Sequence, residues 1–229
     1  MSLRRFQYLS FRSKNDGLTL LESLVAIVVI GISVAVMSPM VILSVATRVQ
    51  SQQAEQAFQI AQAEVDRIKL IVERGGDYTL NIASTPNTVL STADFNTAPK
   101  GPVPAPKNIA ANYSATSDSA KGIDVDNDGN NDYAVQVFKT AGSTTSTGKP
   151  VAFDLGIRVY RADVVNPANS LSVEQAYLGL TSGEGQSATR PLATIYTSII
   201  KSDTDRSLCD YYGFLNSVNG TTVSTPSEC

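Results

Sequence analysis

Residues 17–47 have the sequence GLTLLESLVAIVVIGISVAVMSPMVILSVAT, and this stretch decides how the chain is organised. From Ser23 to Thr47 there is no charged residue, a run of 25 positions. Since a helix rises ~1.5 Å per residue, the run gives about 37 Å of helix, enough to cross the hydrocarbon core of a bilayer. Apolar residues fall on every face of such a helix, which excludes an ordinary amphipathic surface helix. The segment therefore spans a membrane or packs inside an assembly.

A cleaved secretory signal is a second explanation for this apolar segment. Three features disfavour it: the run is longer than a typical signal core, no A-x-A-like cleavage site follows, and the helical pattern continues beyond it. An uncleaved membrane anchor remains open. The residues just before the run favour a third explanation.

Gly17 is followed by an apolar residue, Thr, two apolar residues and Glu, which open the long hydrophobic stretch. This order resembles the prepilin processing site. The resemblance implies that a membrane aspartyl peptidase cuts after Gly17 on the cytoplasmic side and methylates the new amine of Leu18, so that the apolar segment is kept. Gly31 and Pro39 also fall where pilins commonly carry a helix-weakening Gly and a kinking Pro. The resemblance covers residues 14–45 and departs from the family at Leu18, where Phe is commoner.

Glu22 is the informative residue of this segment. A carboxylate near the start of a membrane span costs up to a few kcal/mol, so we expect it to have a partner. The resemblance implies that Glu22 pairs with the free amine of Leu18 on a neighbouring subunit and sets the register of a filament. The alternative is a capping box, because Thr19-x-x-Glu22 places Glu at the third position of a helix begun at Thr19. Both can hold, the cap before assembly and the pair after it. Further on, Pro39 removes one backbone hydrogen bond and is expected to kink the helix.

Residues 48–74 continue the helix as an amphipathic half. Apolar residues recur at spacings of three and four and form one stripe, made of Phe58, Ala61, Val65, Ile68 and Val72. The opposite positions are polar or charged. Gly75 and Gly76 predict the end of the helix. We expect the stripe to pack against the globular domain.

The remainder, residues 77–229, is expected to form an exported β-rich domain. Residues 84–121 are rich in Ser, Thr, Asn, Ala and Pro, and they predict an extended loop with a Pro-rich centre. Strict alternation of apolar residues over 151–159 predicts a half-buried strand. Further strands are predicted at Tyr133–Phe138 and Leu192–Ile200, and 173–180 could form another. We therefore expect an α+β fold in which the long N-terminal helix packs on a C-terminal antiparallel sheet, as in pilins.

The sharpest chemical motif is DVDNDGNND, residues 124–132. Carboxylates stand at positions 1, 3, 5 and 9 of a calcium loop, Gly129 stands at position 6, and Asn130 would offer its backbone carbonyl at position 7. The carboxylates are those of Asp124, Asp126, Asp128 and Asp132. Position 12 is Val135 rather than the bidentate Glu of an EF-hand, and the flanking residues alternate like the arms of a hairpin. The motif resembles the D-x-D-x-D-G-x-x-D loops of extracellular calcium-binding modules, for which we expect a Kd of about 10⁻⁴–10⁻³ M. The alternative is an Asp/Asn-rich turn that needs no metal.

Composition narrows the function further. The chain has no His, which excludes Ser–His and Cys–His catalysis and His-based zinc sites. It also lacks a P-loop, a dinucleotide fingerprint, a nucleophile elbow and a Cys-x-x-Cys motif. We therefore expect that the protein is not an enzyme. Residues 1–17 carry four basic residues and one acidic residue, +3 in all, which leaves −3 − 3 = −6 for the rest. A basic head and an acidic body argue against nucleic-acid binding and fit a head kept on the cytoplasmic side.

The two cysteines, Cys209 and Cys229, both lie near the C-terminus. In an exported chain such a pair predicts a disulfide, worth about 3 kcal/mol on the chain-entropy model. The alternative is two free thiols in a reducing compartment.

These patterns predict four parts: a leader (1–17), a membrane and assembly helix (18–47), its amphipathic continuation (48–76) and the exported domain (77–229). The expected protein is a minor pilin or pseudopilin of a pilus-like filament or a type II-like secretion machine. It would sit in the inner membrane with its domain outside the cytoplasm, with prepilin peptidase and other pilin subunits as partners. The sequence of the predicted helix over residues 45–67 also resembles that of cyanobacterial pseudopilins associated with hormogonium polysaccharide secretion. An alternative of another class is a membrane-anchored extracellular calcium-binding or adhesive domain that never polymerises.

Overall fold

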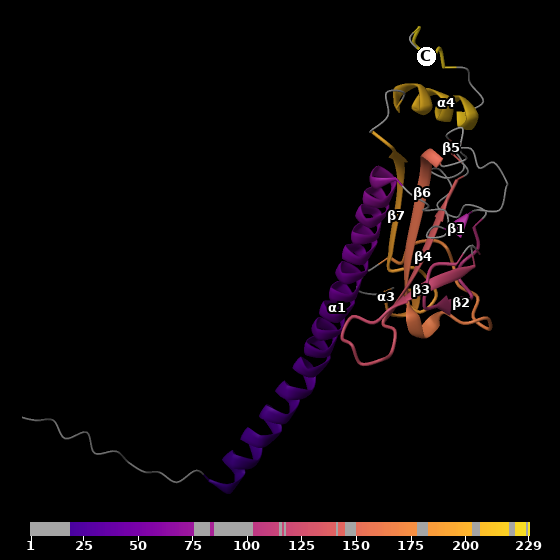
Figure 1. Ribbon diagram of the computed structural model, residues 1–229. Helices are drawn as coiled ribbons and strands as arrows, with labels where there is room; N and C mark the ends of the chain where they lie inside the picture. Colours follow the sequence, from indigo (N-terminus) through magenta and orange to yellow (C-terminus); the bar gives the residue numbers. More distant parts are fainter. Residues whose placement is uncertain are drawn as a thin grey trace, which may run out of the picture. The chain divides into compact units, whose positions relative to one another are not determined.

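The computed structural model describes residues 19–75, 83–84, 103–114, 116, 118–140, 142–144, 150–177, 183–202, 207–219, 223–227 and 229. The chain divides into two compact units, Met1–Ala46 and Thr47–Cys229 (Figure 1). The elements in chain order are α1 (Leu20–Arg74), β1 (Ala83–Ser84), β2 (Asn108–Ala110), β3 (Ser119–Ile123), β4 (Tyr133–Lys139), β5 (Ser143–Thr144), β6 (Pro150–Arg161), the 3-10 helix η2 (Ala162–Val164), α3 (Gly183–Gln186), β7 (Ala193–Ile200) and α4 (Ser207–Asn219). The expected α+β class is confirmed.

The long helix α1 has 55 residues and ends where the glycines predict. Gly75 has a φ of +71°, in the left-handed region that favours glycine after a helix. Its amide donates a hydrogen bond to the carbonyl of Val72 at 3.2 Å. Gly76 lies outside the described residues.

The sheet has the strand order β2-β3-β4-β6-β5, with β7 also paired to β6 and β1 to β4. The predicted strands at 133–138, 151–159 and 192–200 are present as β4, β6 and β7, and they pair antiparallel. The expectation of a wholly antiparallel sheet was wrong, because β1 pairs with β4 and β2 with β3 in parallel. The possible strand at 173–180 is not formed over 173–177, and its last three residues are outside the described part.

Two strands lie in the segment predicted to be a loop, since β2 and most of β3 fall within residues 84–121. The prediction failed there for a physical reason. Strands of three to five residues are too short to show a clear alternation, and their polar composition matches that of loops. What holds them is strand pairing rather than their own sequence, because β3 pairs with β4 and β2 pairs with β3.

One face of the sheet packs against the second half of α1 (Figure 1). The predicted stripe is confirmed at four positions, because Ala61, Val65, Ile68 and Val72 are all buried in this core. Phe58 was assigned to the same stripe, yet it is 45% exposed. It borders a groove beside β7 instead of entering the core.

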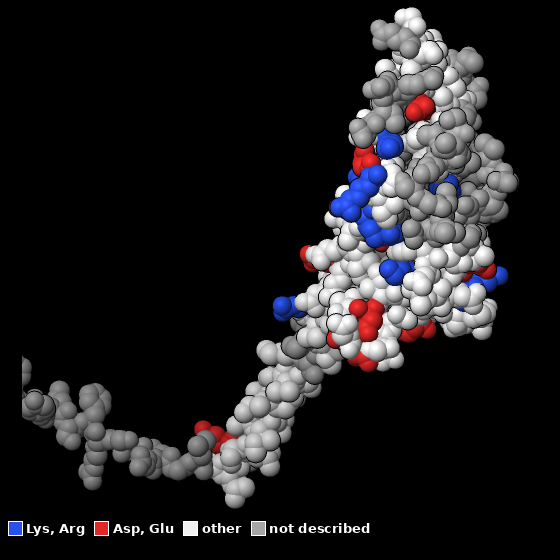
Figure 2. All heavy atoms as spheres, in the orientation of Figure 1, with Lys and Arg blue, Asp and Glu red and all other residues white. Residues whose placement is uncertain are grey.

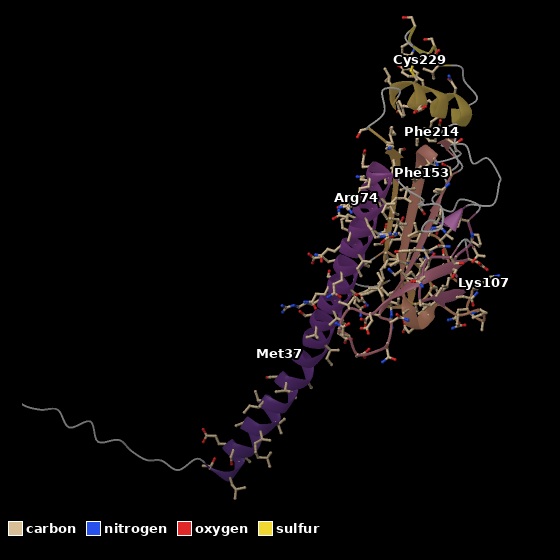
Figure 3. The ribbon with its side chains drawn as sticks, viewed as in Figure 1. Met37, Arg74, Lys107, Phe153, Phe214 and Cys229 are labelled. Atoms are coloured by element: carbon tan, nitrogen blue, oxygen red, sulfur yellow. A yellow bond between two sulfur atoms is a disulfide. The ribbon has the colours of Figure 1, made fainter. Side chains whose placement is uncertain are left out.

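The second face of the sheet is also covered, so β6 is buried on both sides rather than half-buried as predicted. Val164 and Val165 pack on Ala134 and Tyr160 at one end of this face. At the other end Phe214 of α4, which was not predicted, packs on Ala152 (Figure 3). These covering elements are far from β6 in sequence, and local alternation could not indicate them.

Arg158 on β6 is fully buried in the middle of the second face, where it donates several hydrogen bonds. Its Nη1 donates to the carbonyl of Val103 at 2.9 Å, and its Nε donates to Oη of Tyr196 at 3.1 Å. Beside it, Nε2 of Gln136 donates to the carbonyl of Pro104 at 2.7 Å. Because these bonds reach the backbone of the Pro-rich segment, they fix it on the sheet.

The predicted disulfide is present and joins Cys209 of α4 to Cys229, with a Cα–Cα distance of 5.4 Å. The returning chain is also held by Asn216, whose Oδ1 accepts a hydrogen bond from the amide of Val223 at 2.6 Å. The C-terminal residues are thus attached to α4 by a covalent bond and by hydrogen bonds.

Replacing Arg158 with Met should lower the free energy of unfolding by about 2–4 kcal/mol, because buried carbonyl groups lose their donor. Urea unfolding followed by near-ultraviolet circular dichroism of the tyrosines measures this. The matched control is Arg161→Met, which removes a largely exposed ion pair with Asp163 and should cost about 0–1 kcal/mol. Equal effects of the two changes would contradict the role given to Arg158.

Candidate functional site: the N-terminal helix and the acidic loop

The start of α1 is capped by Thr19. The amide of Glu22 donates to Oγ1 of Thr19 at 3.3 Å, which is one of the two bonds of the predicted capping box. The Glu22 side chain is exposed, and among the described contacts its carboxylate has no partner. Gly17 and Leu18, which the prepilin resemblance assigns to cleavage and methylation, lie outside the described residues. Glu22 therefore remains able to pair with another group.

The first part of α1 exposes apolar side chains on every side. None of the stretch Leu20–Met37 is buried, and it is long and apolar enough to cross a membrane. Figure 2 shows this stretch as a white surface with red only near its start. Exposed Leu, Ile and Val in such number are unfavourable in water, so lipid or other apolar helices must cover them. Further along, α1 continues through Pro39 without interruption.

The acidic loop connects two strands, as its alternating flanks predict. Ile123 of β3 pairs with Tyr133 of β4, and the amide of Asp132 donates to the carbonyl of Ile123 at 2.9 Å. The loop is therefore a hairpin connection and not the loop between two helices of an EF-hand.

Within the loop the carboxylates bend the backbone around themselves. Asp124 accepts hydrogen bonds from the amides of Asn127 at 2.7 Å and Gly129 at 2.9 Å. Asp126 accepts from the amide of Asp128 at 3.1 Å. Asn127 and Gly129 adopt φ angles of +58° and +92°, which allow the tight turn. Oxygens of Asp124, Asp126 and Asp128 lie within 4.8 Å of one another.

The other two predicted ligands, Asp132 and Asn130, form hydrogen bonds within the loop. Asp132 is not part of the group of three; its Oδ2 accepts a hydrogen bond from the amide of Val125 at 2.8 Å. Asn130 donates its amide to Oδ1 of Asp128 at 2.7 Å. Three of the predicted carboxylates therefore converge, and the other two residues brace the loop.

Gly122 is a supporting residue that the sequence reasoning missed. A Cβ at this position would lie 2.4 Å from Oδ1 of Asn131, so the glycine leaves room for that side chain against β3. The signal was present in the sequence, since a glycine inside a strand often marks the close approach of another group.

A small polar cavity of about 210 Å³ lies at the end of the acidic loop. Its lining consists of Gln53, Asn131, Asp132, Tyr133, Arg161 and Asp163. Oη of Tyr133 donates to Oε1 of Gln56 on α1 at 2.8 Å, and burial is the main cause that raises the pKa of this phenol. The end of the loop is thus attached to the second half of α1.

The comparisons with known proteins bear on the N-terminal segment. Residues 12–38 match the family described as the prokaryotic N-terminal methylation motif. No curated protein and no solved structure matches the chain. The matched residues include Gly17, Leu18 and Glu22 and most of the exposed apolar helix. The chain therefore carries a type IV pilin-like prepilin segment, followed by a domain that gives it the α+β, pilin-like fold class.

Proposed function

We propose that the protein is a minor pilin or pseudopilin, a structural subunit rather than an enzyme. Prepilin peptidase would cut it after Gly17, and it would join a filament through its apolar helix while its domain lies outside the cytoplasm. The observation that carries this proposal is the coincidence of the methylation motif at 12–38 with the fully exposed apolar stretch Leu20–Met37. The motif alone would support only processing by the peptidase, and the apolar helix alone would support only a membrane anchor.

Glu22 favours assembly over simple anchoring. It is the sole charged residue from Leu18 to Thr47, it is exposed, and it has no carboxylate partner among the described contacts. In lipid such a group is costly unless it finds a cation. Cleavage after Gly17 would create one, the amine of Leu18, on every neighbouring subunit.

The filament would serve a pilus or a type II-like secretion machine, because these share one subunit design. The resemblance over 45–67 to pseudopilins of polysaccharide secretion supports the second use. A membrane-anchored domain that never polymerises is the contrasting possibility, and the next two predictions separate it from a filament subunit.

Mass spectrometry of the protein extracted from membranes should find a mature chain that begins with N-methylated Leu18. The expected mass follows directly from a cut after Gly17 plus one methyl group. An intact chain from Met1, or a cut beyond residue 40, would contradict processing as a prepilin.

Replacing Glu22 with Ala should leave membrane insertion intact and reduce the assembled fraction by about tenfold or more, the effect of losing about 1.4 kcal/mol per contact. Shearing filaments from cells and measuring pelleted subunit by immunoblot gives this fraction. Glu22→Gln distinguishes the two roles, since Gln still completes a capping box but cannot form an ion pair. Rescue by Gln would make capping sufficient and refute the register role. Glu55→Ala, on the amphipathic half, is the matched control.

We further propose that the acidic loop binds Ca²⁺. The support is the convergence of three carboxylates within 4.8 Å, which repel one another unless a cation offsets their charge. Their backbone hydrogen bonds already hold the oxygens in a turn of the kind that calcium loops use. Two of the three side chains are exposed, so a cation from solution can reach them.

For a Kd near 1 mM, 5 mM CaCl₂ should stabilise the protein by about 1 kcal/mol and raise its Tm by about 2–4 °C. Thermal melting with CaCl₂ and with a chelator measures the shift. The double change Asp126→Asn and Asp128→Asn should abolish it, while Asp66→Asn on α1 should preserve it. No shift at millimolar calcium would leave the metal-free turn as the correct interpretation.

A further inference from the structure

Asp154 on β6 is a carboxyl group that the proposed function does not use. It is 2% exposed. Its Oδ1 accepts a hydrogen bond from Oγ of Ser198 at 2.5 Å, whereas its Oδ2 is buried and has no hydrogen-bond partner among the described residues. The amide of Thr140 donates to the carbonyl of Asp154 at 2.9 Å, and the amide of Asp154 donates to Oγ1 of Thr140 at 3.0 Å. These two hydrogen bonds fix the backbone of β6 at Asp154. A buried oxygen without a partner calls for an explanation.

The group lies beside the contact that docks α4. In the β6–β7 register Asp154 faces Ser198, and the next pair on the same face is Ala152 with Ile200. This second pair packs with Phe214 and Tyr211 of α4. Figure 3 labels Phe214 on α4, at the end of the sheet that this helix covers. Asp154, which carries the unpaired oxygen, therefore lies two residues along β6 from Ala152, the residue that contacts α4.

The charged groups around Asp154 do not offset its charge. On β4, Lys139 belongs to the opposite face, where its Nζ lies 5.6 Å from the ring centroid of Phe153. Lys201 follows the end of β7 and Asp210 lies in α4, and neither residue is among the causes that shift the pKa of Asp154. Among the described residues, no Lys or Arg forms an ion pair with Asp154.

Ionisation of such a group is costly. A neutral buried carboxyl with one unpaired oxygen loses part of a hydrogen bond, but an unpaired buried carboxylate loses most of its hydration. Burial accordingly raises the pKa of Asp154, and the hydrogen bond from Ser198 opposes this in part. The folded state thus keeps the proton to a higher pH than the unfolded state does. Stability is greatest below the unfolded pKa, falls as pH rises towards the folded pKa, and stays low above it.

We propose that Asp154 is a pH-sensitive latch for α4: the protonated side chain leaves α4 docked through Phe214, and ionisation admits water and releases the helix. The helix is suited to local release because its contacts with the described strands are mainly those with β5 and β6, at one end of the sheet. The Cys209–Cys229 disulfide then keeps the released helix and the terminal residues attached to each other. This inference does not depend on filament assembly or on calcium.

Hydrogen exchange of the full-length chain in detergent, corrected for the intrinsic effect of pH, tests the latch. Protection of the α4 amides in the wild type should fall by up to about tenfold per pH unit while Asp154 titrates. Asp154→Asn keeps an acceptor for Ser198 but cannot ionise, so its α4 protection should be flat with pH. Asp210→Asn, the matched control on α4 itself, should retain the fall.

A second variant keeps the test decisive if Asp154→Asn does not fold by circular dichroism. Ser198→Ala removes the bond that favours the carboxylate, so the fall in protection should move to higher pH. A wild type without pH response in α4, a full response in folded Asp154→Asn, or an unshifted response in Ser198→Ala would each overturn the proposal.

Discussion

A helix that is apolar on every face is unfavourable in water, and the structure of the chain depends on how its two helix halves are covered. The stretch Leu20–Met37 exposes Leu, Ile and Val on all sides, which is stable only against lipid or other apolar helices. One exposed carboxylate, Glu22, interrupts this surface near its start. A plain anchor gains nothing from that charge. A subunit that must find a fixed position among identical helices gains a point of register from it.

The same helix meets a different requirement after Thr47, where its partner is the protein's own sheet. Only one side of α1 can be apolar there, and Ala61, Val65, Ile68 and Val72 form that side. The sheet must then bury its second face by other means, and it does so with the Pro-rich segment, the loop after η2 and α4. Arg158 and Gln136 supply the donors that make a polar backbone segment acceptable in that cover.

The parts of this fold that sequence reasoning predicted are those with a local period. The helix, its end at Gly75, the strands β4, β6 and β7, and the hairpin around 124–132 all carry their signal within a few residues. The parts it missed depend on distant partners: β2 and β3 are held by pairing with neighbouring strands, α4 docks through Phe214, and Phe58 lies exposed beside β7. For the candidate site, the three convergent aspartates followed from spacing alone. The bracing role of Asp132 and the space beside Gly122 required the folded hairpin.

The domain places its carboxylates in two contrasting surroundings. In the acidic loop, Asp124, Asp126 and Asp128 lie close together at the surface, where a cation or water can offset their mutual repulsion. On β6, Asp154 is buried and has no ion-pair partner among the described residues, and keeping a proton removes its charge there. Under the proposed calcium binding the first arrangement would make the hairpin responsive to cations, and under the proposed latch the second would make the α4 contact responsive to pH. Because both groups are attached to β-strands of one sheet, each can change its own loop or helix without unfolding the core that holds α1.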